Sequence, residues 1–253
     1  MKKLFIASMV LLACACTDKK GGETEQADPL SWGSAELCIE NPVAPGEKEC
    51  YQIKVKVDTL VGESELATSL AAVIRDSILW TQGSTIQEMV KHLADSIEAE
   101  WKTELAERYE PDSEYKDMYQ YYYSLEANQI ENDCDDVLSY SELIDTYLGG
   151  AHGSHYVQYF NFDRATGKLF SIQDVVPADK ETLVLEAMQD RLCEDWEAKD
   201  LADLQEKTGI TMLGDLYLTN NFLLQGDSIT FLFNQYEIAP YAAGLISVTV
   251  SKP

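Results

Sequence analysis

Basic residues are scarce in this sequence of 253 residues, which has 19 lysines and arginines against 44 aspartates and glutamates. The formal net charge of −25 argues against binding to nucleic acid or to anionic lipid headgroups, because like charges repel. The same charge would attract cationic partners, at a rate that salt should reduce. It would also keep the protein soluble, so the charge alone identifies no ligand.

Motifs for metal binding and nucleophilic catalysis are also missing. The six cysteines form no C-x-x-C pair and no Cys/His spacing typical of structural zinc, and no G-x-S-x-G sequence occurs. We therefore expect no metal, no cofactor and no catalytic residue. Cys38 and Cys50 flank the segment IENPVAPGEKE, which has the composition of a hairpin loop. A disulfide between them is predicted for an oxidising compartment.

None of the apolar runs is long enough to span a bilayer as a helix. The run at residues 4–13 follows two lysines and ends in LLAC, an order typical of a lipoprotein signal peptide. We expect residues 1–13 to be that signal and Cys14 to carry the lipid, with Cys16 as the alternative. The lipid would attach the protein to a membrane of the cell envelope, facing the periplasm or the cell surface. An ordinary cleaved signal peptide is the competing interpretation.

Residues 14–35 are polar and glycine-rich with almost no aliphatic side chains, so they are predicted to form a flexible tether. Beyond them, apolar residues recur with period two in some segments and at spacings of three and four in others. The order is strands, helices, strands, a helical insertion and strands. This order predicts an α+β fold with antiparallel sheets and helices packed on one side, as two small α+β subdomains at 36–132 and 133–253.

Two of the three histidines stand in the segment GGAHGSHY at residues 149–156. Its glycines permit positive φ angles and close backbone approach, and they are Gly149, Gly150 and Gly153. The main interpretation is conformational, with His152 anchoring a bend by hydrogen bonds to the backbone. Two alternatives stay open: His152 and His155 could share a metal if the chain curls, or His152 could be the general base of an envelope hydrolase.

Tyrosines supply one candidate binding surface. Tyr119, Tyr121 and Tyr123 alternate along a predicted strand and should share one face. If that face is exposed, the rings would suit a sugar or a protein, because tyrosine offers a large contact area at small entropic cost. If it is buried, the rings belong to the core.

A second candidate is the segment NQYEIAPYAAG at residues 234–244, which contains Tyr236 and Tyr241. Pro240 disfavours helix in the residue before it, and Gly244 allows a sharp bend. The segment is therefore predicted to be a rigid loop between two strands that presents both tyrosines.

Two stretches resemble a known family. YLGGAHGSHYVQYFNFDRATGKLFSIQDVV and ITFLFNQYEIAPYAAGLISVTV resemble the signature and the closing strand–loop–strand of domain of unknown function 3298, over residues 148–250. Residues 37–132 are similar in element order to domain of unknown function 4163, which occurs beside peptidoglycan deacetylase domains. The overall layout resembles small lipoproteins of the Bacteroides group.

The resemblance implies an extracytoplasmic α+β module, which in Gram-positive relatives is the outer part of a lysozyme-sensing anti-sigma factor that binds lysozyme. We expect no transmembrane helix, sigma-binding segment or deacetylase domain here. Ser154 stands where the family commonly has asparagine, and His155 lies outside the usual pattern. The leading hypothesis is a lipid-anchored binding module without chemistry of its own, for a cationic lysozyme-like muramidase or a peptidoglycan fragment. A hydrolase centred on His152 is the alternative.

Overall fold

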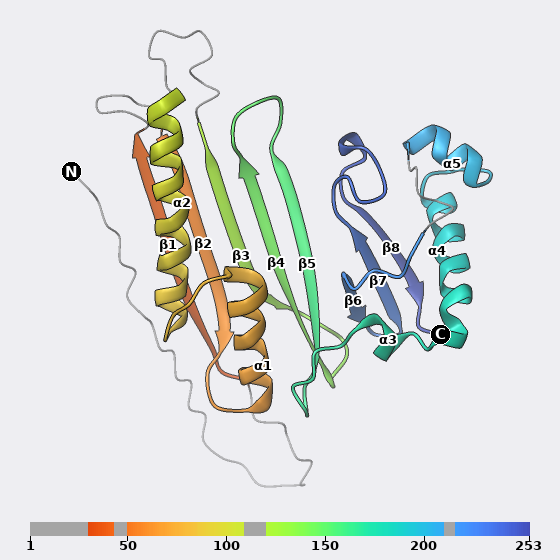
Figure 1. Ribbon diagram of the computed structural model, residues 1–253. Helices are drawn as coiled ribbons and strands as arrows, with labels where there is room; N and C mark the ends of the chain where they lie inside the picture. The colour runs from red at the N-terminus through yellow and green to blue at the C-terminus, as the bar shows by residue number, and fades with distance from the viewer. Residues whose placement is uncertain (1–29, 43–49, 109–119, 210–215) are drawn as a thin grey trace, which may run out of the picture.

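The computed structural model describes residues 30–42, 50–108, 120–209 and 216–253 (Figure 1). It contains a five-stranded sheet in the order β1-β2-β3-β4-β5 and a three-stranded sheet in the order β6-β7-β8. The strands are β1 (Trp32–Pro42), β2 (Cys50–Leu60), β3 (Tyr122–Ile130), β4 (Val137–Tyr147), β5 (Ser154–Asp163), β6 (Phe222–Gln225), β7 (Ser228–Phe233) and β8 (Ile246–Ser251). The helices are α1 (Glu65–Val73), α2 (Ile86–Arg108), α3 (Ile172–Val175), α4 (Glu181–Asp195) and α5 (Leu201–Thr208). The predicted α+β class is confirmed.

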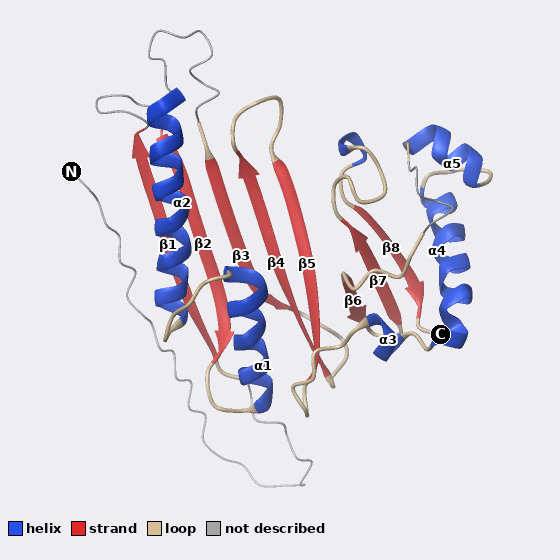
Figure 2. Ribbon diagram, in the orientation of Figure 1, coloured by secondary structure: helices blue, strands red, loops and turns tan. Residues whose placement is uncertain are grey.

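One strand pair differs from the antiparallel prediction. β2 and β3 pair in parallel, with Val55 opposite Leu125, whereas the other neighbouring strands are antiparallel. The cause is the connection, because α1 and α2 carry the chain back to the end at which β2 started. The helices thereby come to lie on one face of the first sheet, where α2 packs against β1 and β2, and α1 against β2 (Figure 2). We call this the helix face.

The helix face is built by the period-two pattern of β2. Its alternate side chains are at most 2% exposed, and they are Tyr51, Ile53, Val55 and Val57. Above them, the Trp101 ring of α2 packs edge-on between Tyr51 and Tyr121, with ring centroids 6.0 and 5.6 Å away. Apolar side chains spaced three and four apart on α1 and α2 complete this core.

The first helix begins and ends with distinct backbone features. The Ser64 hydroxyl accepts a hydrogen bond from the Ala67 N–H and caps α1. The helix then continues as a π-helical turn, Ile74–Leu79, and stops at Trp80, which has a left-handed φ of 50° and is 79% exposed. Residues 65–79 thus form one continuous helical segment, with its last turn wider than an α-helix.

The turn after β5 joins the two halves of the chain. Gly167 has a φ of 71°, and a Cβ there would lie 2.6 Å from the Glu65 carbonyl carbon, so only glycine lets this turn rest on the start of α1. Asp174 in α3 then pairs with Lys168 and forms a capping box with Ser171. The Lys168 ammonium, followed by the Ser171 N–H and hydroxyl, lowers the pKa of Asp174 to about 2.

The second sheet has its own apolar core, formed with α4 and α5. α4 packs along β8, whose alternate side chains Ile246, Val248 and Val250 are buried. Figure 1 shows this sheet beside β5, with α4 and α5 on its far side.

Side-chain amides, which we call the amide seam (Asn161, Asn221, Asn234 and Gln235), join β5 to the second sheet. The main-chain N–H groups of residues 155, 157 and 159 donate to the side-chain oxygens of Gln235, Asn234 and Asn221, at 3.0, 2.8 and 2.9 Å. Asn161 reaches the other way: its Nδ2 donates to the Phe222 carbonyl, and its Oδ1 accepts from the Leu224 N–H. An amide side chain has the donor and acceptor of a peptide group, so these residues replace a neighbouring strand along the β5 edge.

The predicted Cys38–Cys50 disulfide is not formed. Cys38 is a free thiol opposite Lys54, and Cys50 is opposite Pro42, so they are four positions apart along the hairpin. Four strand residues span roughly 13 Å, well beyond the Cα separation that a disulfide allows. Cys134 and Cys193 are also free.

Two predicted boundaries, the end of the tether and the division between the subdomains, can be compared with the strands of the structure. β1 begins at Trp32, inside the expected tether, because the Trp32 ring stacks on Tyr140 at 6.3 Å. The predicted division at residue 132 falls between β3 and β4, which pair along their whole length. The expected signal peptide, both lipidation candidates and Tyr119 lie outside the described residues. Within the described ranges, none of the helices has the length and apolarity needed to cross a membrane.

Candidate functional site

The two loops singled out in the sequence meet at one end of the two sheets (Figure 1). The His152 ring stacks on the Tyr241 ring, with centroids 3.6 Å apart and planes at 18°. Tyr236 lies next to Tyr241, at 5.8 Å between centroids. Residues more than 80 positions apart therefore form one aromatic group, although the sequence contains no direct signal for this contact.

Glycines shape the first of these loops. Gly149 and Gly150 have positive φ angles of 79° and 93°, and the Tyr147 hydroxyl donates to the Gly150 carbonyl at 2.8 Å. Gly153 is held for another reason, since a Cβ there would lie 2.6 Å from the Thr146 carbonyl oxygen and 3.3 Å from the Tyr122 hydroxyl. Gly149 and Gly150 turn the chain, and Gly153 allows it to return close to β4.

Replacing Gly153 with alanine should lower the free energy of unfolding by about 1–3 kcal/mol, because the added methyl forces the β4 backbone away. Urea unfolding followed by circular dichroism would measure the change. The neighbouring exposed Ser154 provides the control, and Ser154→Ala should change stability by less than about 0.5 kcal/mol. Equal effects of the two variants would contradict the close approach.

The second loop is fixed by its own hydrogen bonds. A Glu237 carboxylate oxygen accepts from the Asn234 N–H at 2.6 Å, closing the turn in which Tyr236 adopts a φ of 69°. A left-handed φ is unfavourable for tyrosine, and this side chain is 66% exposed. Pro240 and Gly244 border a short 3₁₀ turn, Tyr241–Ala243. The loop lies between the strands β7 and β8, as predicted, and presents Tyr236 to solvent.

The two histidines of the first loop point to different partners. His152 Nδ1 contacts the Gly153 carbonyl oxygen at 3.0 Å, a backbone contact of the kind expected from the sequence. His155 Nδ1 pairs with Asp145, directly opposite on β4. The two imidazoles thus have separate contacts, and the described part of the chain contains no group of three or more residues able to hold a metal ion.

The tyrosines at the start of β3 point to both faces of the first sheet. Tyr121 is 4% exposed and packs on Trp101, and Tyr123 packs partly buried against the same core. Tyr122 points to the opposite face, is 36% exposed and stacks on Tyr147 at 6.3 Å. Tyr121 and Tyr123 therefore belong to the core, which is one of the two interpretations of this strand. The exposed ring is that of Tyr122, which is not among the predicted binding residues.

The aromatic surface consists of Tyr122, Tyr147, His152, Tyr236 and Tyr241. The loop backbone connects its two parts, because Tyr147 bonds to Gly150 and Tyr122 lies against Gly153. Tyrosine and histidine present apolar rings with polar tips, which suits a surface that must be stable in water and also bind a partner.

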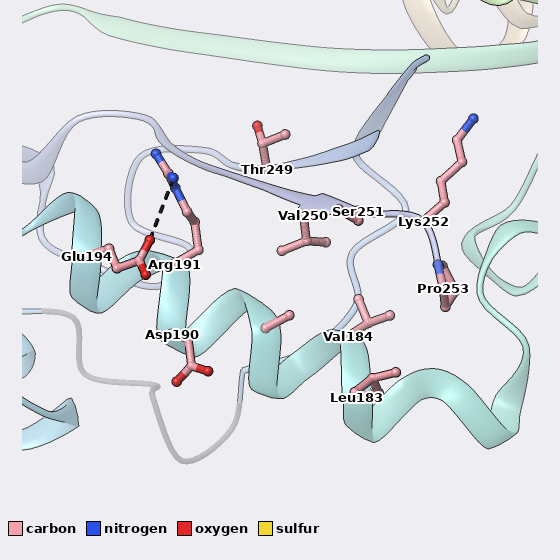
Figure 3. Close-up of a pocket in the computed structure, with 11 residues that line it drawn as sticks. Leu183, Val184, Asp190, Arg191, Glu194, Thr249, Val250, Ser251, Lys252 and Pro253 are labelled. Atoms are coloured by element: carbon pink, nitrogen blue, oxygen red, sulfur yellow. Dashed lines mark ion pairs between the residues drawn. The ribbon is translucent and has the colours of Figure 1, made fainter. Parts of the chain in front are cut away.

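A groove of about 450 Å³ lies elsewhere, between α4 and β8 (Figure 3). Leu183, Val184 and Val250 line its apolar part, and Arg191 turns toward Glu194, its ion-pair partner. No residue of the aromatic surface lines this groove. Its buried side chains, Val184 and Val250, belong to the core between helix and sheet, so its shape follows from that packing.

The architecture is that of an α+β protein in which a five-stranded mixed sheet adjoins a three-stranded antiparallel sheet. Residues 173–252 match the family described as "Protein of unknown function (DUF3298)". The predicted resemblance is thereby confirmed for the C-terminal part. The match begins after the GGAHG segment, which had been expected inside the family region.

Two solved structures described as members of that family share the fold of this chain. The chain is similar to a DUF3298 family member from Bacteroides fragilis, at 21% identity and a TM-score of 0.73, covering 88% of this chain and 90% of that one. It is also similar to a DUF3298 family protein from Pseudomonas aeruginosa, at 18% identity and a TM-score of 0.57, covering 88% and 91%. No curated protein matches the chain.

Proposed function

We propose that this protein is a lipid-anchored binding module of the cell envelope that holds a cationic protein partner on its aromatic surface. The observation that carries the proposal is the meeting of two distant loops in one group of rings, in which His152 and Tyr236 are exposed and Tyr241 is partly buried. Tyrosines are enriched at interfaces and among the residues that dominate binding energy.

The amide seam supports this role because it holds the surface in a fixed geometry. Gln235 accepts from the His155 N–H, and Asn234 accepts from the Val157 N–H, so the start of the second loop is attached to β5. A surface already ordered before binding loses less conformational entropy on association. Tyr236 in a left-handed conformation fits the same interpretation, since backbone strain concentrates at ligand-binding positions.

The anchor and the location rest on the sequence. The signal-like N-terminus places a lipid on Cys14, or alternatively on Cys16, and the polar segment after it would hold the folded part away from the membrane. The net charge of −25 favours a cationic partner, and the resemblance of residues 37–132 to domain of unknown function 4163 makes a lysozyme-like muramidase the first candidate.

Hydrolysis centred on His152 has less support. Its ring is stacked on Tyr241 and its Nδ1 contacts a backbone carbonyl, whereas a general base needs an orienting group and a nucleophile within hydrogen-bond reach. The histidine paired with a carboxylate is His155.

Calorimetry with hen egg-white lysozyme at low and high salt tests the proposal. Tyr236→Ala should weaken binding at low salt at least about tenfold, the loss expected for a central interface tyrosine. Trp196→Ala is the control, because Trp196 is 39% exposed at the end of α4 and should leave affinity within about twofold. No binding at low salt, or equal loss in both variants, would refute the proposal. Binding of a muropeptide in place of lysozyme, lost in Tyr236→Ala, would reassign the surface to glycan.

A further inference from the structure

Glu142 lies in the middle of β4 with its side chain on the helix face. Cross-strand pairing places it opposite Ala127 of β3 and Gln158 of β5. The helices pack mainly on β1 and β2, so β4 and β5 lie to one side of them (Figure 2). The side chain is nevertheless only 4% exposed, because its neighbours on the sheet cover it.

Glu142 differs from every other buried polar side chain that the structure describes. The other five all make hydrogen bonds, and they are Ser139, Asn161, Thr219, Asn221 and Asn234. Within the described ranges, Glu142 has neither a hydrogen-bond partner nor an ion-pair partner. Burial without compensation raises the pKa of this carboxyl to about 7. A buried polar group left unpaired is rare in folded proteins and calls for an explanation in function.

Two tyrosines lie on the same face of the sheet as this carboxyl: Tyr156 pairs with Ile144 and Tyr123 pairs with Thr146, two and four residues along β4 from Glu142. Burial, and after it the Glu142 charge, raise the pKa values of both Tyr123 and Tyr156, so both hydroxyls lie within the electrostatic field of the carboxylate. Tyr156 is 38% exposed and forms the outer edge of the group. Gln158 does not compensate the acid, because its amide donates to the Tyr159 carbonyl and its oxygen accepts from the Tyr156 hydroxyl.

We propose that Glu142, Tyr123 and Tyr156 form a binding site for a primary ammonium group on an alkyl chain, such as that of a lysine side chain. An ammonium carries three donors and a full positive charge, which together compensate a buried carboxylate. Tyrosine rings attract cations through their faces, and the alkyl chain fits the partly buried Ile144 beside them. A neutral sugar hydroxyl would leave the carboxylate charge uncompensated. Tyr156, which is 38% exposed and bonded to the Gln158 side chain at 3.2 Å, is the member of this group that reaches solvent.

The Glu142 carboxyl lies on the face of the sheet opposite to Tyr122 and Tyr147 of the aromatic surface, whereas Tyr156 is near Glu237 of the second loop. The inference does not rest on the proposed function, and its test contains no protein partner.

The test is a titration of the protein with Nα-acetyl-lysine N-methylamide, followed by NMR of the Glu142 carboxyl carbon and of the tyrosine rings. Saturation should lower the apparent pKa of Glu142 by at least about one unit, because ammonium binding and ionisation of the acid are linked. The corresponding norleucine amide, which lacks the charge, should cause no shift. A parallel titration with butylamine distinguishes two sources of the ammonium group. Tighter binding of the lysine amide than of butylamine indicates a lysine side chain of a protein. Equal binding indicates that any free alkylamine is accepted.

Two variants decide the assignment. Glu142→Gln keeps the shape, removes the charge and should weaken lysine amide binding at least about tenfold. Glu126→Gln is the matched control on the opposite face of the same sheet, where Glu126 pairs with Lys54, and it should bind like the parent protein. Binding that survives in Glu142→Gln, or norleucine amide binding as well as lysine amide, would overturn the proposal.

Discussion

Glu142→Gln should raise the free energy of unfolding by about 3 kcal/mol at pH 8 and leave it nearly unchanged at pH 4. Burial raises the pKa of this carboxyl from 4.5 to about 7, so the folded protein holds the proton more tightly than the unfolded chain does. The stability gained from the bound proton is fully present below about pH 4.5 and is lost as the pH rises through about 7. Glutamine carries no charge at either pH and therefore removes this loss.

Urea unfolding of the parent protein and the variant between pH 4 and pH 8 would measure the difference. Any substitution that removes a negative charge also reduces the repulsion in a chain of net charge −25, and Glu126→Gln controls for this contribution. The Lys54 ammonium lowers the pKa of Glu126, so this control should lose stability at neutral pH. Parallel stability curves for parent protein and Glu142→Gln would show that Glu142 reaches water.

Asn161→Ala should destabilise the protein by about 3–5 kcal/mol, because it leaves the Phe222 carbonyl and the Leu224 N–H without partners and removes the acceptor of the Ser139 hydroxyl. The Asn161 side chain bonds to the Phe222 carbonyl, the Leu224 N–H and the Ser139 hydroxyl, at 2.7, 3.1 and 2.9 Å. Alanine can replace none of these bonds. Since the first and second sheets meet at this point, the loss should affect the unfolding of both.

Chemical denaturation monitored by tryptophan fluorescence would test this expectation. Asn161→Asp retains an acceptor for Leu224 but loses the donor to Phe222 and buries a charge, so it should also destabilise. Asn128→Ala is the matched control, because Asn128 is exposed on β3 and bonds only to Ser141 in solvent, and the change should stay below about 0.5 kcal/mol. A loss of similar size in Asn128→Ala would contradict the importance of the amide seam.

The strands and helices follow from local patterns, but their pairing does not. Alternation along β2 predicts a half-buried strand, and Tyr51, Ile53, Val55 and Val57 are indeed buried on one face. The parallel pairing of β2 with β3 depends on the path of two intervening helices, which local periodicity does not contain. The disulfide prediction failed for a related reason, because loop position alone does not fix the register of Cys38 and Cys50.

The tyrosines at the start of β3 show what the alternation of side chains along a strand predicts and what it does not. It correctly predicts that Tyr121 and Tyr123 share a face. Whether that face is inside depends on Trp101, a residue 20 positions earlier on α2. Tyr122 lies on the other face, and it is the ring that reaches the surface.

His155 could have been found from the sequence. β4 and β5 form a hairpin around Gly150, and the pairing follows from that centre, which places Asp145 opposite His155. The amide seam had no such signal, since Asn221 and Asn234 lie 62 or more positions from the strand they bind.

The parallel pairing of β2 with β3 has a consequence for how the chain folds. Val55 and Leu125 are neighbours in the sheet but 70 residues apart in the chain. The hairpins β1–β2 and β4–β5 can form early from local contacts, whereas β2 and β3 meet only after the segment with both helices has compacted between them. Completion of the five-stranded sheet is therefore expected to be the slow, late event of folding.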